Sequence, residues 1–220
     1  MNDLNLENAR NNMIKQQLRP SEIIDDRVLN AMQSVPRENF APEAYRQIAY
    51  ADFEIPLGSG QSMLSPRIEG RLLQALDIQP DDDALVVGTG SGYLSAVIST
   101  LANRVTSVEV DSELAERAQQ RLKQQGIENV SIVVGDATRG LDDYAPYDVI
   151  ALTGSVTEVP RLILENMRVS GRLFAVTGTP PAMQAVLVTR KNANEWESKD
   201  LFDTELAPLE NGTQSAPFSF

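Results

Sequence analysis

Helix-type and strand-type hydrophobic patterns alternate between residues 68 and 191, and this alternation restricts the chain to a small set of folds. The text ALVVG, residues 84–88, has four apolar residues in a row, as in a strand buried on both faces. Further strands are expected at 104–110, 129–135, 147–154, 172–178 and 185–191. Helices are expected at 68–76, 93–101, 112–126 and 159–167. The order predicts an α/β fold with a Rossmann-like, doubly wound, mostly parallel sheet.

The first 66 residues lack this alternation. Spaced apolar residues between 4 and 18 predict a modestly amphipathic helix that ends at Pro20. A second helix is expected after Asp25 and stops at Pro36, and Pro42 opens a short third one. Residues 1–66 therefore form a helical extension that ends in a loop, YADFEIPLGSGQSMLSP, with room for a short strand. We expect this extension and an α/β domain over residues 67–220 to pack as one compact unit.

Composition excludes several kinds of chemistry and partner. The 220 residues include no cysteine and no histidine, which excludes disulfides, thiolate nucleophiles, Ser-His-Asp catalysis and the commonest metal ligands, so no metal site is expected. A net charge of -12 argues against nucleic acid as a partner. No apolar run reaches the about 18 residues of a membrane span, and the N-terminus lacks the apolar stretch of a signal peptide. We expect a cytoplasmic protein with no membrane partner; its oligomeric state is not indicated.

A glycine-rich turn, GTGSG, follows the first predicted strand of the domain and opens a helix. Gly88, Gly90 and Gly92 permit a tight turn there and let backbone N–H groups approach a ligand. Tyr93 stands where a dinucleotide fingerprint has its third glycine, which makes a pyrophosphate ligand less favoured. Such a turn also serves packing alone, so the motif by itself is a weak signal of ligand binding.

Two acidic residues end the next strands. Glu109 lies 21 residues beyond Gly88, at a position where a carboxylate can accept ribose hydroxyl protons. Asp136 follows the third strand in the text GDA. Each acid could equally be a solvated surface group. Because parallel strands end at one edge of a sheet, the turn and the two acids together predict a nucleoside pocket.

The texts GTGSG, VEVD and GDA together resemble the first motifs of class I S-adenosylmethionine-dependent methyltransferases. Longer texts, among them VLNAMQSVPRENFAP, YADFEIPLGSGQSMLSP and APYDVIALTGSVTEVP, resemble the protein-L-isoaspartate O-methyltransferase family. The resemblance extends from about residue 13 to about residue 210. It implies transfer of a methyl group from S-adenosyl-L-methionine (SAM) to the carboxylate of isoaspartyl residues in damaged proteins or peptides, with S-adenosyl-L-homocysteine as product.

The resemblance also implies site residues. In the family, the glycines lie under the methionine part of SAM, the acid of the second strand binds ribose and the GDA-type residues meet adenine. The implied cofactor-binding residues are Gly88, Thr89, Gly90, Ser91, Gly92, Glu109, Val110, Asp136, Ala137 and Thr153. The implied substrate loop, residues 60–66, contains Gly60, Gln61, Met63, Leu64 and Pro66, with Ser62 and Ser65 as candidate catalytic hydroxyls. A carboxylate acceptor is already ionised at neutral pH, so no histidine is needed as a general base.

The chain departs from the family in three places. The family's loop reads GQTIS, one residue and proline, whereas this loop reads GQSMLSP and has Leu64 at the active-site serine. Leucine cannot donate the hydrogen bond to a bound carboxylate, a bond that contributes about 1.5–3 kcal/mol. Ser65 is adjacent, but neighbouring side chains of an extended segment face opposite ways. Val86 replaces an acid of the family's LEIG text, and GDA replaces GDG.

These departures leave alternatives open. One is a SAM-binding homologue that acts as a sensor or scaffold without transfer, and another is a methyltransferase with a different carboxylic acid as acceptor. An NAD-dependent dehydrogenase is disfavoured because the third glycine and any histidine are absent. DNA amino-methylation is disfavoured because the strand at 147–154 runs into ALTGS and the chain is acidic. Arg37 and Glu38 form either a structural ion pair or a contact with substrate.

Overall fold

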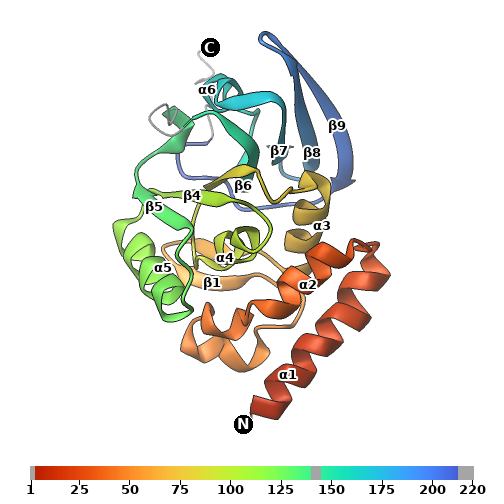
Figure 1. Cartoon of the computed structure of the whole chain (residues 1–220), viewed down its shortest axis with the longest axis vertical. Helices are drawn as coiled ribbons and strands as arrows, with labels where there is room; N and C mark the ends of the chain where they lie inside the picture. Colours follow the sequence, from red (N-terminus) through yellow and green to blue (C-terminus); the bar gives the residue numbers. More distant parts are fainter. Residues whose placement is uncertain (1–2, 140–144, 213–220) are drawn as a thin grey trace.

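The computed structural model describes residues 3–139 and 145–212, built around a seven-stranded sheet (Figure 1). The strand order across the sheet is β5-β4-β3-β6-β7-β8-β9. The strands are β3 (Asp83–Val87), β4 (Arg104–Glu109), β5 (Val130–Val134), β6 (Tyr147–Val156), β7 (Met167–Thr179), β8 (Ala182–Asn192) and β9 (Glu195–Asp203). All pairs from β5 to β7 are parallel, and β8 and β9 are antiparallel to their neighbours. The predicted α/β fold with a mostly parallel sheet is confirmed.

Both faces of the central strands are buried, as the apolar run in β3 predicted. Alternate residues of β3 enter two different hydrophobic clusters. Ala84 and Val86 belong to the larger cluster, which also holds residues of the N-terminal helices, and Leu85 and Val87 belong to the smaller one. Since side chains of a strand alternate between faces, the two clusters lie on opposite sides of the sheet.

The helices divide between these two faces. The α-helices are α1 (Asp3–Asn12), α2 (Asp26–Ser34), α3 (Pro66–Leu76), α4 (Tyr93–Ser99), α5 (Ser112–Gln124) and α6 (Arg161–Glu165). The 3-10 and π segments are η1 (Met13–Leu18), η2 (Arg19–Ser21), η3 (Arg37–Asn39), η4 (Glu43–Ile48) and η5 (Ala137–Arg139). Buried residues of α2, α3 and α4 join the larger cluster, whereas Ile163 of α6 joins the smaller one. Figure 1 shows α1 and α2, in red and orange, on the side of α3 and α4.

The N-terminal extension is helical, as expected, and ends in a hairpin. The helix predicted over residues 4–18 consists of α1 and the π-helical segment η1, which buries Met13 and Leu18. Asp25 caps α2 by accepting a hydrogen bond from the Arg27 backbone N–H at 2.8 Å. Within the loop at 50–66, β1 (Ile55–Gly58) and β2 (Gln61–Met63) pair antiparallel.

Strand β9 is a finding that the patterns did not predict. Its sequence, EWESKDLFD, has most side chains exposed, because it lies at the edge of the sheet and, among the described strands, pairs with β8 alone. The side chain of Trp196 connects β9 to α6, because its indole Nε1 donates a hydrogen bond to the Leu164 carbonyl at 3.1 Å. A charged edge strand has no alternating hydrophobic pattern to detect. In the described ranges, no helix has the length and apolar character that crossing a membrane requires.

Candidate active site

One pocket joins the carboxyl ends of the parallel strands to the loop before α3. Nine of the predicted cofactor-binding residues line it: Gly88, Thr89, Gly90, Ser91, Glu109, Val110, Asp136, Ala137 and Thr153. Four residues of the substrate loop line the same pocket: Gln61, Ser62, Met63 and Leu64. The remaining predicted residues, Gly60, Ser65, Pro66 and Gly92, are not among its lining residues. Folding therefore brings the two predicted groups, which are apart in sequence, to one cavity.

The turn between β3 and α4 requires glycine for two different reasons. The φ angles of Gly88 and Gly92 are +92° and +87°, in the left-handed region that other residues avoid. A Cβ on Gly88 would lie 2.2 Å from Oγ1 of Thr153 on β6. A Cβ on Gly92 would lie 3.2 Å from Cβ of Ala118 on α5. Gly88 thus allows a close approach at the pocket, whereas Gly92 allows α4 and α5 to pack.

Hydrogen bonds between buried hydroxyl groups stabilise the turn between β3 and α4. Oγ1 of Thr89 lies 2.7 Å from Oγ of Ser107, which in turn lies 2.8 Å from Oγ of Ser95, and all three residues are buried. The Thr153 hydroxyl donates to the Gly88 carbonyl at 2.8 Å. Because the Thr89 hydroxyl is engaged with Ser107, we infer that Thr89 contributes to the pocket through its backbone.

Backbone amides orient the carboxylate of Glu109 at the end of β4. Its Oε2 accepts from the N–H of Gly90 at 2.8 Å, and its Oε1 accepts from the N–H groups of Val110 and Asp111 at 3.0 and 3.2 Å. A carboxylate offers about four acceptor positions, so Oε2 keeps capacity for a ligand hydroxyl. The acid and the glycine-rich turn are therefore one hydrogen-bonded unit.

A C-terminal segment forms a wall of the pocket that sequence analysis missed. Leu206, Ala207, Leu209 and Glu210 line the pocket. Ser155 on β6 holds this segment, because its N–H donates to the Ala207 carbonyl and its carbonyl accepts from the Leu209 N–H, both at 2.9 Å. The text LENGTQSAPFSF, residues 209–220, predicts a loop, and residues 213–220 lie outside the described residues. These contacts depend on tertiary structure, and no local pattern signals them.

The second strand-end acid contacts this C-terminal wall. Oδ1 of Asp136 accepts from the backbone N–H of Thr138 at 3.0 Å, and its Oδ2 accepts from Nδ2 of Asn211 at 3.2 Å. Asp136 therefore links the end of β5 to the C-terminal segment across one side of the pocket.

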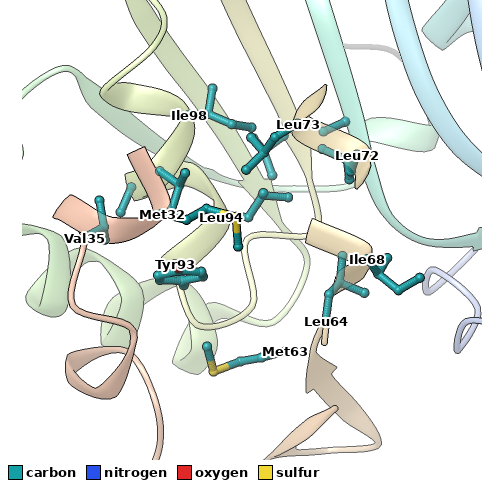
Figure 2. Close-up of a cluster of buried hydrophobic side chains, with 14 of the residues drawn as sticks. Met32, Val35, Met63, Leu64, Ile68, Leu72, Leu73, Tyr93, Leu94 and Ile98 are labelled. Atoms are coloured by element: carbon teal, nitrogen blue, oxygen red, sulfur yellow. The ribbon is translucent and has the colours of Figure 1, made fainter. Parts of the chain in front are cut away.

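The substrate loop presents leucine to the pocket where the family has serine. Met63 and Leu64 are buried among the side chains of Ile68, Tyr93 and Leu94 (Figure 2). Leu64 lines the pocket and Ser65 does not, although both are buried. Ser65 is extended, with φ -68° and ψ 150°, so its side chain and that of Leu64 face different directions.

A buried ion pair lies behind this loop. Arg37 is 0% exposed, and its Nη1 donates to Oε2 of Glu69 on α3. Its Nε donates to the Ala49 carbonyl at 2.8 Å, and its Nη2 donates to the Leu64 carbonyl at 2.5 Å. The guanidinium also lies 4.7 Å from the ring centroid of Tyr93. Arg37 thus forms a structural ion pair, with Glu69 in place of the neighbouring Glu38, and anchors the backbone of Leu64.

Burial gives Glu69 an unusual titration. Burial raises its pKa from 4.5 to about 7, although Arg37 acts in the opposite direction. The folded state then binds more protons than the unfolded state between these values, so this group lowers stability as the pH rises from about 4.5 to about 7, by roughly 3 kcal/mol in full. Glu69→Gln is expected to remove this decline. Urea unfolding from pH 4.5 to 7.5 measures it, with the exposed Glu116→Gln as control. Parallel pH profiles for Glu69→Gln and the wild type would contradict the assignment.

A family model supplies the deciding comparison. The model described as Protein-L-isoaspartate(D-aspartate) O-methyltransferase (PCMT) matches residues 8–214. The chain belongs to this family. A protein-L-isoaspartate O-methyltransferase of Koribacter versatilis is 40% identical over 93% of this chain and 90% of its own length. The corresponding protein 2 of Pelobacter propionicus is 38% identical over 93% of this chain and 92% of its own length.

Solved protein-L-isoaspartate O-methyltransferases share the fold. One has a TM-score of 0.81 at 24% identity and covers 90% of this chain, which spans 65% of that longer chain. Another, from Plasmodium falciparum and in complex with S-adenosyl-L-homocysteine, has a TM-score of 0.78 at 22% identity, covering 93% of this chain and 97% of that one. The class I SAM-dependent methyltransferase fold is therefore confirmed.

The departures from the protein-L-isoaspartate O-methyltransferase pattern lie in different surroundings. Val86 is fully buried in the larger hydrophobic cluster and does not line the pocket. Leu64 does line the pocket. Ala137, at the third departure, also lines the pocket. The changes at Leu64 and Ala137 therefore alter the surface that a ligand meets, whereas the change at Val86 does not.

Proposed function

We propose that this protein transfers the methyl group of SAM to the carboxylate of L-isoaspartyl residues in damaged proteins, with S-adenosyl-L-homocysteine as the second product. The main observation behind the proposal is that the glycine-rich turn, Glu109 and the substrate loop line the same pocket. Relatives that are 40% and 38% identical over nine-tenths of the chain bear the name of this activity, which supports the same conclusion.

The charge of the pocket lining favours SAM. Five acidic residues line it: Glu54, Glu69, Glu109, Asp136 and Glu210. Among the described lining residues there is no lysine or arginine. SAM carries a sulfonium and an ammonium group against one carboxylate, so an acidic wall favours it. Gly88 and Gly90 present backbone without side chains, which lets a ligand approach closely.

Each part of the pocket then has a separate task. Gly88 and Gly90 would lie under the methionine part of SAM, Glu109 would accept the ribose hydroxyls, and Asp136 and Ala137 would lie beside adenine. Bound SAM supplies a methyl group that is electrophilic because it is attached to a sulfonium. The acceptor carboxylate needs no general base, so the chain's contribution is to orient it and to exclude water. Ser62 and Gln61 offer donors, and Met63 and Leu64 form an apolar wall.

Methyl transfer with labelled SAM tests the proposal directly. The substrates are an isoaspartyl peptide and its aspartyl counterpart, and calorimetry on the same protein measures SAM binding. Transfer to the isoaspartyl peptide alone is expected. SAM binding without transfer to either peptide would contradict the proposal and favour the sensor or altered-acceptor hypotheses. Absence of SAM binding would contradict the cofactor assignment as well.

Glu109→Gln is expected to weaken SAM binding by about 10- to 100-fold, because hydrogen bonds from ribose to a charged group contribute about 1.5–3 kcal/mol. Glutamine keeps the size of the side chain but loses the negative charge and one acceptor oxygen. Calorimetric titration with SAM measures the change. Glu113→Gln is the matched control, because Glu113 is exposed in the first turn of α5, just beyond Glu109. Equal affinities of the two variants would exclude Glu109 as a cofactor ligand.

We infer that residues 1–66 and 67–220 form one compact unit. Met13 and Leu29 of the extension belong to the same buried cluster as Val86 and Val149 of the sheet. A chain that starts at residue 67 would expose this face, so it is expected not to fold by itself. Circular dichroism and thermal unfolding of the truncated chain check this, and a cooperative transition would contradict it.

A further inference from the structure

Glu69 places a buried carboxyl group in the wall of the pocket next to the substrate loop. It lies in the first turn of α3, is 2% exposed, and lines the pocket together with Met63 and Leu64. Within residues 3–139 and 145–212, the only hydrogen bond to its side chain comes from Arg37 and reaches Oε2. Its other oxygen, Oε1, has no hydrogen-bond partner there. A nine-tenths buried acid with a free oxygen at a pocket is available to a ligand.

The groups around Glu69 leave its charge only partly compensated. Arg37 faces it from η3, but two of the donors of Arg37 are used by the carbonyls of Ala49 and Leu64. Tyr93 faces it from α4, with a buried hydroxyl that has no hydrogen-bond partner in the described part of the chain. Glu54, from the loop before β1, lines the same pocket and adds a second acid. None of these groups offers a further positive charge.

A carboxylate acceptor meets a second carboxylate at this position. The sulfonium of SAM balances the charge of the acceptor, but Glu69 and the acceptor would repel each other if both were ionised in a desolvated site. Two carboxylates also have no donor between them, so they cannot form a hydrogen bond without a proton. Two carboxylates that share a site solve this by sharing one proton, because then only one of them is charged.

We propose that Glu69 binds the acceptor carboxylate through a shared proton and so supplies the hydrogen bond that Leu64 cannot donate. This inference rests on the proposed function. The complex then contains the Arg37 cation, the neutral Glu69 acid and the acceptor anion, so one proton is taken up when the acceptor binds. The pKa of Glu69, which burial raises to about 7, means that protonation near neutral pH has a small free-energy cost.

The proton stays on Glu69 during the reaction. One acceptor oxygen attacks the methyl carbon, the new O–C bond forms, and the C–S bond breaks with its electron pair going to sulfur. The other acceptor oxygen accepts the hydrogen bond from Glu69. The ester product carries no charge, so Glu69 releases the proton to solvent after the product leaves. Glu69 is therefore an acceptor-binding residue whose contribution appears in KM.

Proton uptake on peptide binding tests the proposal. The complex of the full chain with S-adenosyl-L-homocysteine is titrated with an isoaspartyl peptide at pH 8, in phosphate and in Tris, whose ionisation enthalpies differ. The wild type is expected to take up about one proton, and its KM is expected to rise about tenfold for each pH unit above about 7, with little change in kcat. Glu69→Gln keeps a donor without the titration, so it should take up no proton and show a flat KM profile. Glu116→Gln, at an exposed position of α5 outside the pocket, is the control and should retain the uptake.

The outcomes separate this inference from the function on which it rests. Methyl transfer by the wild type without proton uptake would overturn the role of Glu69 and leave the proposed function intact. Uptake that persists in Glu69→Gln, or that disappears in Glu116→Gln, would also overturn it. No peptide binding and no transfer at any pH would overturn both proposals. The wild-type measurement in the two buffers decides the question even if Glu69→Gln does not fold.

Discussion

Gly88→Ala is expected to abolish SAM binding and to lower the free energy of unfolding by about 2–4 kcal/mol. Gly88 has φ +92°, where an alanine side chain is strained, and the added Cβ would lie 2.2 Å from Oγ1 of Thr153. This steric clash can be relieved only if the turn moves away from β6. That movement also displaces Gly90, whose N–H orients the carboxylate of Glu109. Calorimetric SAM titration and urea unfolding measure the two effects.

Gly126→Ala separates backbone strain from the steric clash. Gly126 follows α5 and has φ +68°, and no heavy atom of the described residues lies within 4 Å of an added Cβ. Its replacement should cost only the backbone strain, about 1–2 kcal/mol, and leave SAM affinity unchanged. Adding Thr153→Ala to Gly88→Ala should recover the steric part of the stability loss. Full SAM affinity in Gly88→Ala would contradict the close approach of the turn and β6.

Arg37→Met is expected to lower the free energy of unfolding by about 3–5 kcal/mol. Arg37 is fully buried, and its removal leaves the Glu69 carboxyl and the carbonyls of Ala49 and Leu64 without their donors. Loss of the bond to the Leu64 carbonyl also releases the substrate loop, so a rise in KM for the peptide should accompany the loss of stability. Urea unfolding and steady-state kinetics on the same preparation measure both.

The partner substitution tests the same ion pair. Glu69→Met leaves the buried Arg37 guanidinium without a counter-charge, and a guanidinium cannot release its proton, so a loss of similar size is expected. The double variant should be more stable than the sum of the single changes predicts, because neither charge is left unpaired. Arg46→Met is the control on an exposed pair, with Glu43 at 3.8 Å, and should cost under about 1 kcal/mol. Equal losses at Arg37 and Arg46 would exclude the anchoring role.

The sheet and the glycine-rich turn could be predicted because their signals are local. The sequence of β3 is a run of apolar residues, and such a run is typical of a strand that is buried on both faces. The turn GTGSG has positive φ angles, which few residue types other than glycine adopt. Gly88 and Gly92 therefore predict the turn directly from the sequence. Glu109 follows from the same local pattern, because the end of the next parallel strand lies at the same edge of the sheet.

Other parts of the site depend on contacts between residues that are far apart in sequence. The C-terminal wall that includes Leu209 has no regular pattern, because Ser155, more than 50 residues away in sequence, holds its backbone. The sequence does not identify the ion-pair partner of Arg37, because Glu69 lies 32 residues further along the chain and many acidic residues are nearer in sequence. The orientation of the Thr89 hydroxyl depends on its hydrogen bond with Ser107, a residue on the neighbouring strand β4.

The sequence by itself determined the α/β fold, the strand-end pocket and the family, because hydrophobic periodicity and glycine conformation act within a few residues. Only the tertiary structure decided which side chains face that pocket. It placed Leu64 in the wall and Val86 in the core, and it set Glu69 beside Arg37 at the substrate loop. The physical reason is that burial and charge compensation depend on every element packed around a group, and that environment exists only once the chain has folded.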